Sequence, residues 1–198
     1  MSEKRVIVAI VYHSGYGHTK KLATAVAQGV DKVENATSLL LDVDEAQTKW
    51  AELETVDAII FGAPTYMGSV SAPFKAFMDA TSPAVWAKDF AWKDKLAAGF
   101  TSSASRAGDK LNTLIQFAIF AAQHGMHWIS LGLPPANNSS TGSEEDLNRT
   151  GHFLGAAAQS NADQGPDLAP PVADLETGSH LGSRVANAAL QFKYGKLN

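Results

Sequence analysis

The sequence predicts an α/β protein with a mostly parallel sheet and helices on both of its faces. Short apolar segments of strand length alternate with longer segments in which apolar residues recur at helical spacing. The first short segment, Val6 to Val11, is apolar without alternation, as expected for a strand that is covered on both faces. A chain that repeats strand, loop and helix in this way forms a parallel sheet with right-handed crossovers.

The expected elements follow in order along the chain. Strands are expected over residues 6–11, 38–43, 56–62, 96–100 and 126–131. Helices are expected from about Lys20, over residues 45–53, from about Ala72, from Leu111 to near Gly125, and over residues 173–192. The polar, proline-bearing segments at about 133–149 and 161–171 are expected to be loops. Residues 151–158 are ambiguous: they fit a segment that lines the site, a strand or a subunit contact. The whole chain, residues 1–198, is expected to form one domain.

The composition limits the class of protein. Apolar residues make up 45% of the chain and charged residues 18%, which argues against disorder. A net charge of −4 gives no reason to expect a nucleic acid or an anionic membrane as partner. The chain has no cysteine, so thiol catalysis and cysteine-bound metals are excluded, and its histidines show no metal-binding spacing. The first apolar run is too short for a signal peptide or a membrane span, so we expect a cytoplasmic protein.

The segment between the first strand and the first helix has the features of an anion site. Residues 12–19 read Tyr-His-Ser-Gly-Tyr-Gly-His-Thr. The two glycines let the backbone curl, and the N–H groups and the dipole at the start of the helix favour a negative charge. Ser14, Tyr16 and Thr19 can each donate a further hydrogen bond to a phosphate oxygen. An ordinary turn whose hydroxyl groups cap the helix remains an alternative.

Two more loops follow strands and therefore lie at the same edge of a parallel sheet, where ligands bind. The segment from Gly62 to Gly68 carries a proline that stiffens it, and Tyr66 and Met67 can contact a flat ligand. The segment from Thr101 to Asp109 has four hydroxyl residues that can bind the polar edge of a ring or a sugar chain. Taken singly, a proline-bearing turn and a serine-rich helix cap explain these two segments about as well.

These motifs, in this order, resemble those of WrbA-type NAD(P)H:quinone oxidoreductases, which are flavodoxin-like proteins. The first loop has the Tyr-x-Ser-x-Tyr-Gly-His form of that family. Residues 62–68, followed by Ser71 and by residues 74–79, are similar to its flavin-contacting loop and the next helix. Residues 123–126 resemble its His-Gly-Met element, and Trp86 falls where the family places a tryptophan. The resemblance covers most of residues 5–132.

The resemblance implies a flavodoxin-like three-layer sandwich with a five-stranded parallel sheet in the order 2-1-3-4-5. It implies that FMN is the cofactor and that NADH or NADPH is the electron donor. The FMN phosphate would lie on Ser14, Gly15, Tyr16, Gly17, His18 and Thr19. The ring would contact Pro64, Thr65, Tyr66, Met67 and Gly68 on one side and Ser102, Ser103, Ala104, Ser105 and Gly108 at its other edge. His124 would lie near the cofactor, Tyr16 near the nicotinamide and Trp86 near the quinone.

The function that follows is the transfer of two electrons from NAD(P)H to a quinone by a ping-pong mechanism. The flavin carries the hydride, so no catalytic side chain and no metal are expected. An electron carrier without its own NAD(P)H turnover, or a non-redox flavin-binding module, are alternatives. The family implies a homo-oligomer, a dimer or more typically a tetramer, in which neighbouring subunits complete the site. This chain departs from the family at Tyr66, where an arginine is common, and in the third loop, which has fewer glycines.

Overall fold

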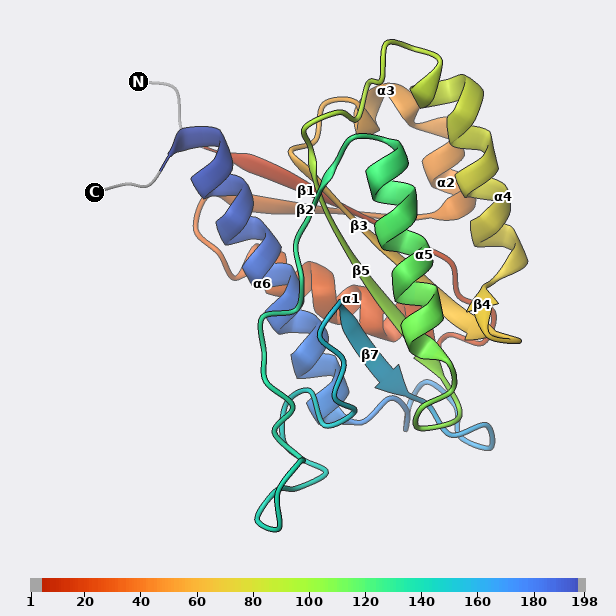
Figure 1. Ribbon diagram of the computed structural model, residues 1–198, viewed down its shortest axis with the longest axis vertical. Coiled ribbons are helices and arrows are strands. Elements are labelled where there is room, and N and C mark those ends of the chain that lie inside the picture. The colour runs from red at the N-terminus through yellow and green to blue at the C-terminus, as the bar shows by residue number, and fades with distance from the viewer. Residues whose placement is uncertain (1–4, 196–198) are drawn as a thin grey trace.

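The computed structural model describes residues 5–195, and its centre is a parallel sheet in the order β2-β1-β3-β5-β6. The main strands are β1 (Val6–Tyr12), β2 (Ala36–Asp42), β3 (Ala58–Tyr66) and β5 (Leu96–Ser103). Two short strands, β6 (His127–Trp128) and β7 (Ala156–Gln159), both pair with β5, and β4 (Ser69–Val70) pairs with the end of β3. Figure 1 shows this arrangement. The predicted flavodoxin-like fold class and strand order are confirmed.

Helices cover both faces of the sheet. One face is packed by α1 (His18–Asp31) and α6 (Val172–Tyr194), whose apolar residues join those of the strands in one core cluster. The other face is packed by α2 (Val43–Thr48), α3 (Trp50–Leu53), α4 (Ala72–Thr81) and α5 (Lys110–Gln123), which form a second cluster. A π-helical turn, η1 (Ser82–Trp86), continues α4. The segment predicted as one helix over 45–53 forms two short helices, α2 and α3.

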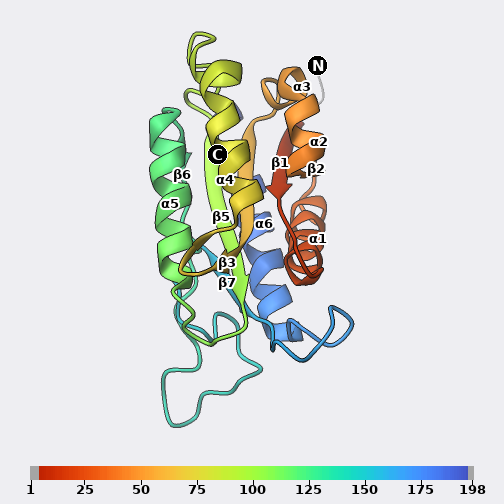
Figure 2. The same cartoon turned by 90° about the vertical axis from the view of Figure 1, so that its right-hand side faces the viewer.

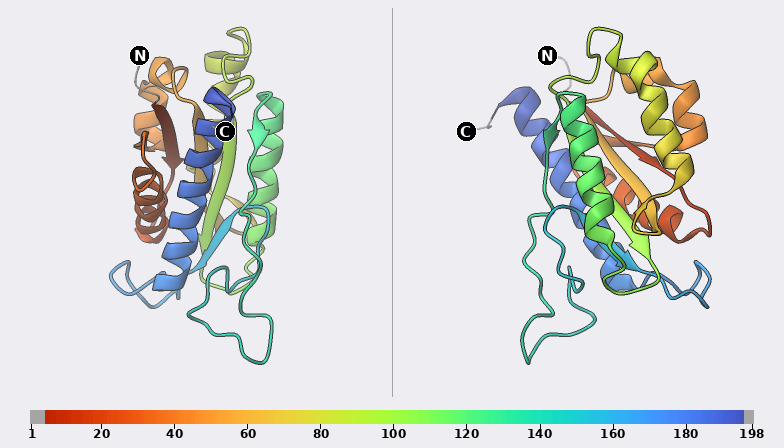
Figure 3. Two further views of the ribbon diagram at one scale, coloured as in Figure 1. Left: turned by 90° about the vertical axis from the view of Figure 1, so that its left-hand side faces the viewer. Right: turned by 45° about the vertical axis from the view of Figure 1, so that its right-hand side comes forward.

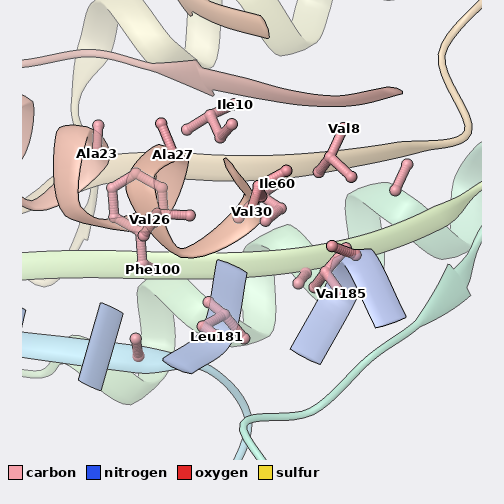
Figure 4. Packing of buried hydrophobic residues seen from close by; sticks show 14 of the residues in the cluster. Val8, Ile10, Ala23, Val26, Ala27, Val30, Ile60, Phe100, Leu181 and Val185 are labelled. Atoms are coloured by element: carbon pink, nitrogen blue, oxygen red, sulfur yellow. The ribbon is translucent and has the colours of Figure 1, made fainter. Parts of the chain in front are cut away.

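The first core cluster forms where α1 and α6 meet the middle of the sheet. Figure 4 shows Val26 of α1 and Leu181 of α6 close to Ile60 and Phe100 of the sheet. The two helices approach closely because glycines lie between them. A methyl group on Gly29 would lie 1.9 Å from the carbonyl oxygen of Ser179, and one on Gly182 would lie 2.0 Å from that of Val26. Glycine at these positions thus fixes the spacing of the two helices.

Two strands are longer than the sequence predicts, and both extend toward the same edge. The parallel pairing of β3 with β5 continues to Pro64 and Ser102. β3 then extends to Tyr66 by antiparallel pairing with β4, and β5 extends to Ser103 by parallel pairing with β7. Proline and hydroxyl residues favour loops, but tertiary pairing outweighs this local preference. The expected loops at 62–68 and 101–109 are therefore reduced to Met67–Gly68 and to residues 104–109.

The fifth position of the sheet is filled by two strands instead of one. The predicted strand over 126–131 is wrong in extent, since only β6 pairs there, beside the start of β5. β7 pairs beside the end of β5, so residues 151–158 do contain a strand. Residues 129–155 leave the sheet between the two and form a long loop without helix or strand. Figures 2 and 3 show this loop reaching beyond the edge of the sheet where β7 ends.

The glycine contact between α1 and α6 predicts a large effect of one methyl group. Gly182→Ala should lower the free energy of unfolding by about 1–3 kcal/mol, because the new methyl meets backbone atoms that cannot move alone. This loss should outweigh the gain of about 1 kcal/mol in helix propensity. Gly178→Ala is a matched control on the same helix, since its methyl would meet only the side chains of Leu22 and Val26. Urea unfolding measures both; a Gly182→Ala variant as stable as Gly178→Ala would contradict this account.

Candidate functional site

The turn between β1 and α1 leaves several hydrogen-bond donors without partners. Gly17, which precedes the first residue of α1, has a φ of 90°, a conformation that favours glycine. Its N–H donates to Ser14 Oγ at 3.1 Å. Within residues 5–195, nothing accepts a hydrogen bond from the N–H groups of Tyr16, His18 and Thr19, or from the hydroxyl of Thr19, which is 2% exposed. Unpaired donors at the positive end of a helix form an anion site.

The hairpin of β3 and β4 forms a second wall. Met67 and Gly68, the two residues between the strands, have φ values of 47° and 78°, as in a type I′ turn. The hairpin is held to α5, because Asn112 Nδ2 donates to the Gly68 carbonyl and Ser69 Oγ donates to Gln116 Oε1. This turn places the side chain of Met67 fully in solvent. An apolar side chain at such a tip is suited to cover a flat ligand.

Tyr66 closes the hairpin against the first turn. Its hydroxyl lies so close to Gly15 that a methyl group at that glycine would be 2.5 Å away. The rings of Tyr66 and Tyr16 meet edge to face, with centroids 6.3 Å apart. Burial raises the pKa of the Tyr66 phenol, so the group is a neutral donor at physiological pH. Glycine at position 15 therefore makes room for the tyrosine that stands where the family commonly has an arginine.

The third wall joins residues 103–109 to the segment that follows β7. Ser102 Oγ and Ser160 Oγ are 2.9 Å apart, and Ser160 N–H donates to the Ser103 carbonyl. Farther along the same segment, His18 Nε2 lies 2.8 Å from the Gln164 carbonyl oxygen and Lys21 Nζ donates to that of Asp167. Residues 160–167 thus bridge the hydroxyl-rich loop and the start of α1. They close one side of the space between them.

These walls enclose a cavity of about 930 Å³ at the edge where the strands end. It is lined by most of the predicted residues, namely Tyr16, His18, Thr19, Pro64, Thr65, Tyr66, Met67, Gly68, Ser102, Ser103, Ala104, Ser105 and Gly108. Ser14, Gly15 and Gly17 lie in the adjoining turn. Sequence reasoning missed the lining residues Asp109, Ser160, Ala162, Gln164 and Gly165. The signal for the last four was the alanine run of β7, since a parallel strand there brings the next loop to this edge.

His124 and Trp86 do not reach this cavity. Helix α5, which ends just before His124, runs toward the opposite edge of the sheet, where β5 begins (Figure 1). The turn η1, which ends at Trp86, follows α4 at the same edge. His124, 3% exposed, packs against Trp92 and Phe120. The expectations of a histidine near the cofactor and a tryptophan near the quinone are thus not met in the chain's own cavity, because the helix and the turn that carry them run away from the ends of the strands.

The environment of His124 fixes its protonation. The Thr81 hydroxyl donates to the Met78 carbonyl, so His124 Nε2, 2.9 Å from that hydroxyl, is the donor between them. His124 Nδ1 is then a buried acceptor without a partner in the described chain. Burial lowers the pKa of His124 from 6.5 to about 4, so the ring is neutral and does not act as a cation at the end of α5.

A buried ion pair holds the long loop near the site. Arg149 Nε and Nη2 donate to the two oxygens of Asp174 at 2.8 and 2.9 Å, and both residues are less than 10% exposed. Asp174 also accepts the N–H of Gln159 at 2.8 Å. Glu144 pairs with Arg149 and with Arg106 of the third wall, and these two cations lower the pKa of its carboxyl. The network connects α6, β7 and residues 103–109.

A second cavity, of about 900 Å³, lies between α5 and the long loop. Its lining is mainly apolar, including Leu111, Leu133 and Phe153, with Lys110 and His152 among the polar residues. The unpaired N–H groups at the start of α1 are far from it, on the other side of residues 103–109. The first cavity is therefore the better candidate for an anionic ligand.

Comparison with known proteins shows which family this chain resembles. Residues 31–138 match the family described as NADPH-dependent FMN reductase. Flavodoxin FldP of Pseudomonas aeruginosa is 44% identical over 186 residues, covering 92% of this chain and 96% of the relative. An NAD(P)H dehydrogenase (quinone) of Geotalea uraniireducens is 31% identical over 204 residues, covering 92% of this chain and 98% of the relative. The resemblance to NAD(P)H:quinone oxidoreductases of this fold is confirmed.

A solved structure gives the same result. The flavodoxin, WrbA-like protein from Agrobacterium tumefaciens aligns with a TM-score of 0.72 and 41% identity, over 94% of this chain and 98% of that one.

Among residues 5–195, none of the helices has the length and apolar character to cross a bilayer. The same range holds no group of three or more histidine or acidic side chains that could bind a metal ion.

Burial of His124 predicts a dependence of stability on pH. Below pH 6.5 the unfolded chain protonates this ring, whereas the folded protein does so only near pH 4. The unfolded state binds more protons in this window, so the free energy of unfolding should fall as pH falls, by up to about 1.4 kcal/mol per pH unit. Urea unfolding at pH 7 and pH 5 measures the loss. Between pH 7 and pH 5 the free energy of unfolding should fall less in His124→Gln than in the wild type. An equal fall in both proteins would refute the buried, neutral ring.

Proposed function

The chain belongs to the NADPH-dependent FMN reductase family, and on this premise we propose that it is an FMN-dependent oxidoreductase that transfers two electrons from NADH or NADPH to a quinone. One observation carries the proposal: the cavity joins an anion site to a space with hydroxyl and aromatic walls at a single edge of the sheet. FMN, when bound, supplies the chemistry of accepting and passing on the electrons. The protein supplies binding, orientation and the exclusion of water. The proposal takes residues 1–198 as one functional domain.

The first turn fits the phosphate of FMN. The N–H groups of Tyr16, His18 and Thr19 and the hydroxyl of Thr19 are without protein acceptors in the described chain. Ser14 Oγ accepts from Gly17, so its own hydroxyl hydrogen is free to donate to a phosphate oxygen. Hydrogen bonds to a charged group contribute about 1.5–3 kcal/mol each. A dianionic phosphate would thus replace the solvent that these donors otherwise need.

The hairpin and the third wall fit the ring. We place one ring face against residues 64–68 and its polar edge along residues 102–108. A series of buried hydroxyl groups holds the ends of β3 and β5 in place below the ring: Thr113 donates to Thr65, Thr65 to Thr101, and Thr101 to the Ala63 carbonyl. Because its hydrogen is used in this chain, Thr65 meets the ring through its methyl group or backbone.

Tyr16, Tyr66 and Met67 stand at the opening, with exposed fractions of 77%, 38% and 102%. We assign the nicotinamide to this opening, beside Tyr16, and expect the quinone to enter by the same route after the oxidised nucleotide has left. That order gives ping-pong kinetics. Trp86, exposed at the opposite edge, would contact a quinone only in the cavity of a second copy, in the dimer or tetramer that the family resemblance implies.

A second function remains open because the relative with 44% identity is named a flavodoxin. An electron carrier uses the same fold and the same cofactor but passes electrons between partner proteins. Carriers commonly use a strong charge to find their partners, and a net charge of −4 is modest for this purpose. The quinone reductase is therefore the preferred proposal.

An anaerobic titration tests the proposed function. The purified protein should bind FMN and be yellow, NADH or NADPH should bleach it, and benzoquinone should restore the colour. Absorbance at the flavin band follows each step. Bleaching by dithionite but by neither nucleotide would favour the carrier, and failure to take up FMN would refute both functions.

The phosphate assignment has its own test. Ser14→Ala combined with Thr19→Ala should weaken FMN binding by about 100-fold or more, because two donors to a charged group are lost. The fold should remain intact by circular dichroism. Thr24→Ala is the matched control, since this exposed hydroxyl on α1 donates only to the Lys20 carbonyl. FMN fluorescence quenching gives the dissociation constants, and unchanged affinity in the double variant would show that the phosphate lies elsewhere.

A further inference from the structure

Lys110 is a fully buried lysine between residues 103–109 of the first cavity and the second cavity, whose lining includes it. It is the first residue of α5 and is 0% exposed. Its Nζ donates to the carbonyl oxygens of Ser105 at 2.5 Å and Arg106 at 3.0 Å. Burial of an ammonium group is costly, and the positive end of a helix disfavours a cation. Neither packing nor helix formation accounts for a lysine here.

The carbonyl groups of residues 104–106 all accept hydrogen bonds from side chains, and that of Ser105 accepts one from Ser103 Oγ as well. Lys110 takes those of Ser105 and Arg106, and Gln159 Nε2 donates to that of Ala104 at 3.2 Å. In a trans peptide the N–H points opposite to the preceding carbonyl. The N–H groups of Ser105, Arg106 and Ala107 therefore point away from these donors, and nothing in residues 5–195 accepts from them. Three free donors result, on a loop of which Ser103, Ala104, Ser105 and Gly108 line the first cavity and Ala107 lines the second.

The charge of Lys110 has no ion pair among the described residues. Asp174 of α6 is the carboxylate that attracts it, but both oxygens of Asp174 are already held by Arg149. Arg149 of the long loop repels Lys110, and His152 of the same loop is a neutral neighbour, since burial lowers its pKa. Burial lowers the pKa of Lys110 to about 8. The ammonium is thus charged at neutral pH and would be stabilised by an anion in the cavity.

We propose that Lys110 is a positioning residue that holds residues 103–108 against the flavin ring and that its charge favours the reduced, anionic form of that ring. The inference rests on the proposed FMN site. Reduction by a hydride from NAD(P)H brings two electrons and one proton to the ring and leaves it with one negative charge. A cation behind the ring's polar edge lowers the energy of that charge in a poorly solvated site. The bound FMN is then easier to reduce.

The first test separates charge from loop position. Lys110→Met removes the ammonium at nearly constant volume and should weaken binding of reduced FMN at least tenfold relative to oxidised FMN. For a two-electron couple this lowers the midpoint potential by about 30 mV or more. Gln159→Leu removes the uncharged donor to the same loop and should weaken both forms equally, leaving the potential unchanged. Lys88→Met, at an exposed lysine on the opposite edge, should change neither quantity.

The second test uses the wild type alone. Above pH 8 Lys110 is neutral beside oxidised FMN, and the anionic reduced ring should restore its proton. Reduction should therefore take up one extra proton per two electrons, which steepens the pH dependence of the midpoint potential by about 30 mV per pH unit. Spectroelectrochemistry between pH 7 and 9 measures this slope. Lys110→Met should not show the steeper slope.

The outcomes separate this proposal from the proposed function. If the wild type binds FMN but Lys110→Met has the same potential and the same slope, the role of Lys110 is refuted and the FMN site stands. If Lys110→Met does not fold, a wild-type slope without the change near pH 8 refutes the role of its charge. If the wild type takes up no FMN, the proposed function fails, and this proposal fails with it.

Discussion

The parallel pairing of β1, β3 and β5 is the constraint on which the rest of the structure depends. Val11 pairs with Phe61, and Phe61 with Gly99, so the three strands run in register and end at one edge. Their side chains are buried on both faces, which requires helices above and below and therefore long crossovers. Every crossover begins at that edge, where the start of α1, the β3–β4 hairpin and residues 103–109 meet. The site therefore lies at this edge because the helices that cover the core are connected to the strands there.

Much of this arrangement could be predicted from local patterns. The apolar run of β1, the glycines and hydroxyl residues of the next turn, and the helical spacing in α1 all report short-range preferences. The ends of β3 and β5 could not be predicted, because Pro64 and Ser102 favour loops and become strand only by pairing with each other. The division of the fifth strand into two could not be predicted either, because β6 and β7 take their positions in the sheet only by pairing with β5.

The residues that sequence reasoning missed share one cause. Ser160, Gln164 and Gly165 reach the cavity because β7 returns to the sheet, held through Gln159 and Arg149 on Asp174. Lys110 was missed because a lysine beside a loop suggests a surface residue, and only the packed structure shows it buried. His124 and Trp86 are the reverse case: the motif that suggested them gives no direction in space, and neither lines the chain's own cavity. Long-range contacts decide all of these positions.

In the proposed function, FMN binds at the edge where the parallel strands end, with its phosphate on the start of α1 and its ring edge on residues 103–108. The most direct measurement is a titration with FMN followed by ¹H–¹⁵N correlation spectra of the assigned protein. The account predicts the largest shifts at the amides of Tyr16, His18 and Thr19 and at those of Ser105, Arg106 and Ala107. Shifts concentrated instead at Leu133, His152 and Phe153, around the second cavity, would contradict it.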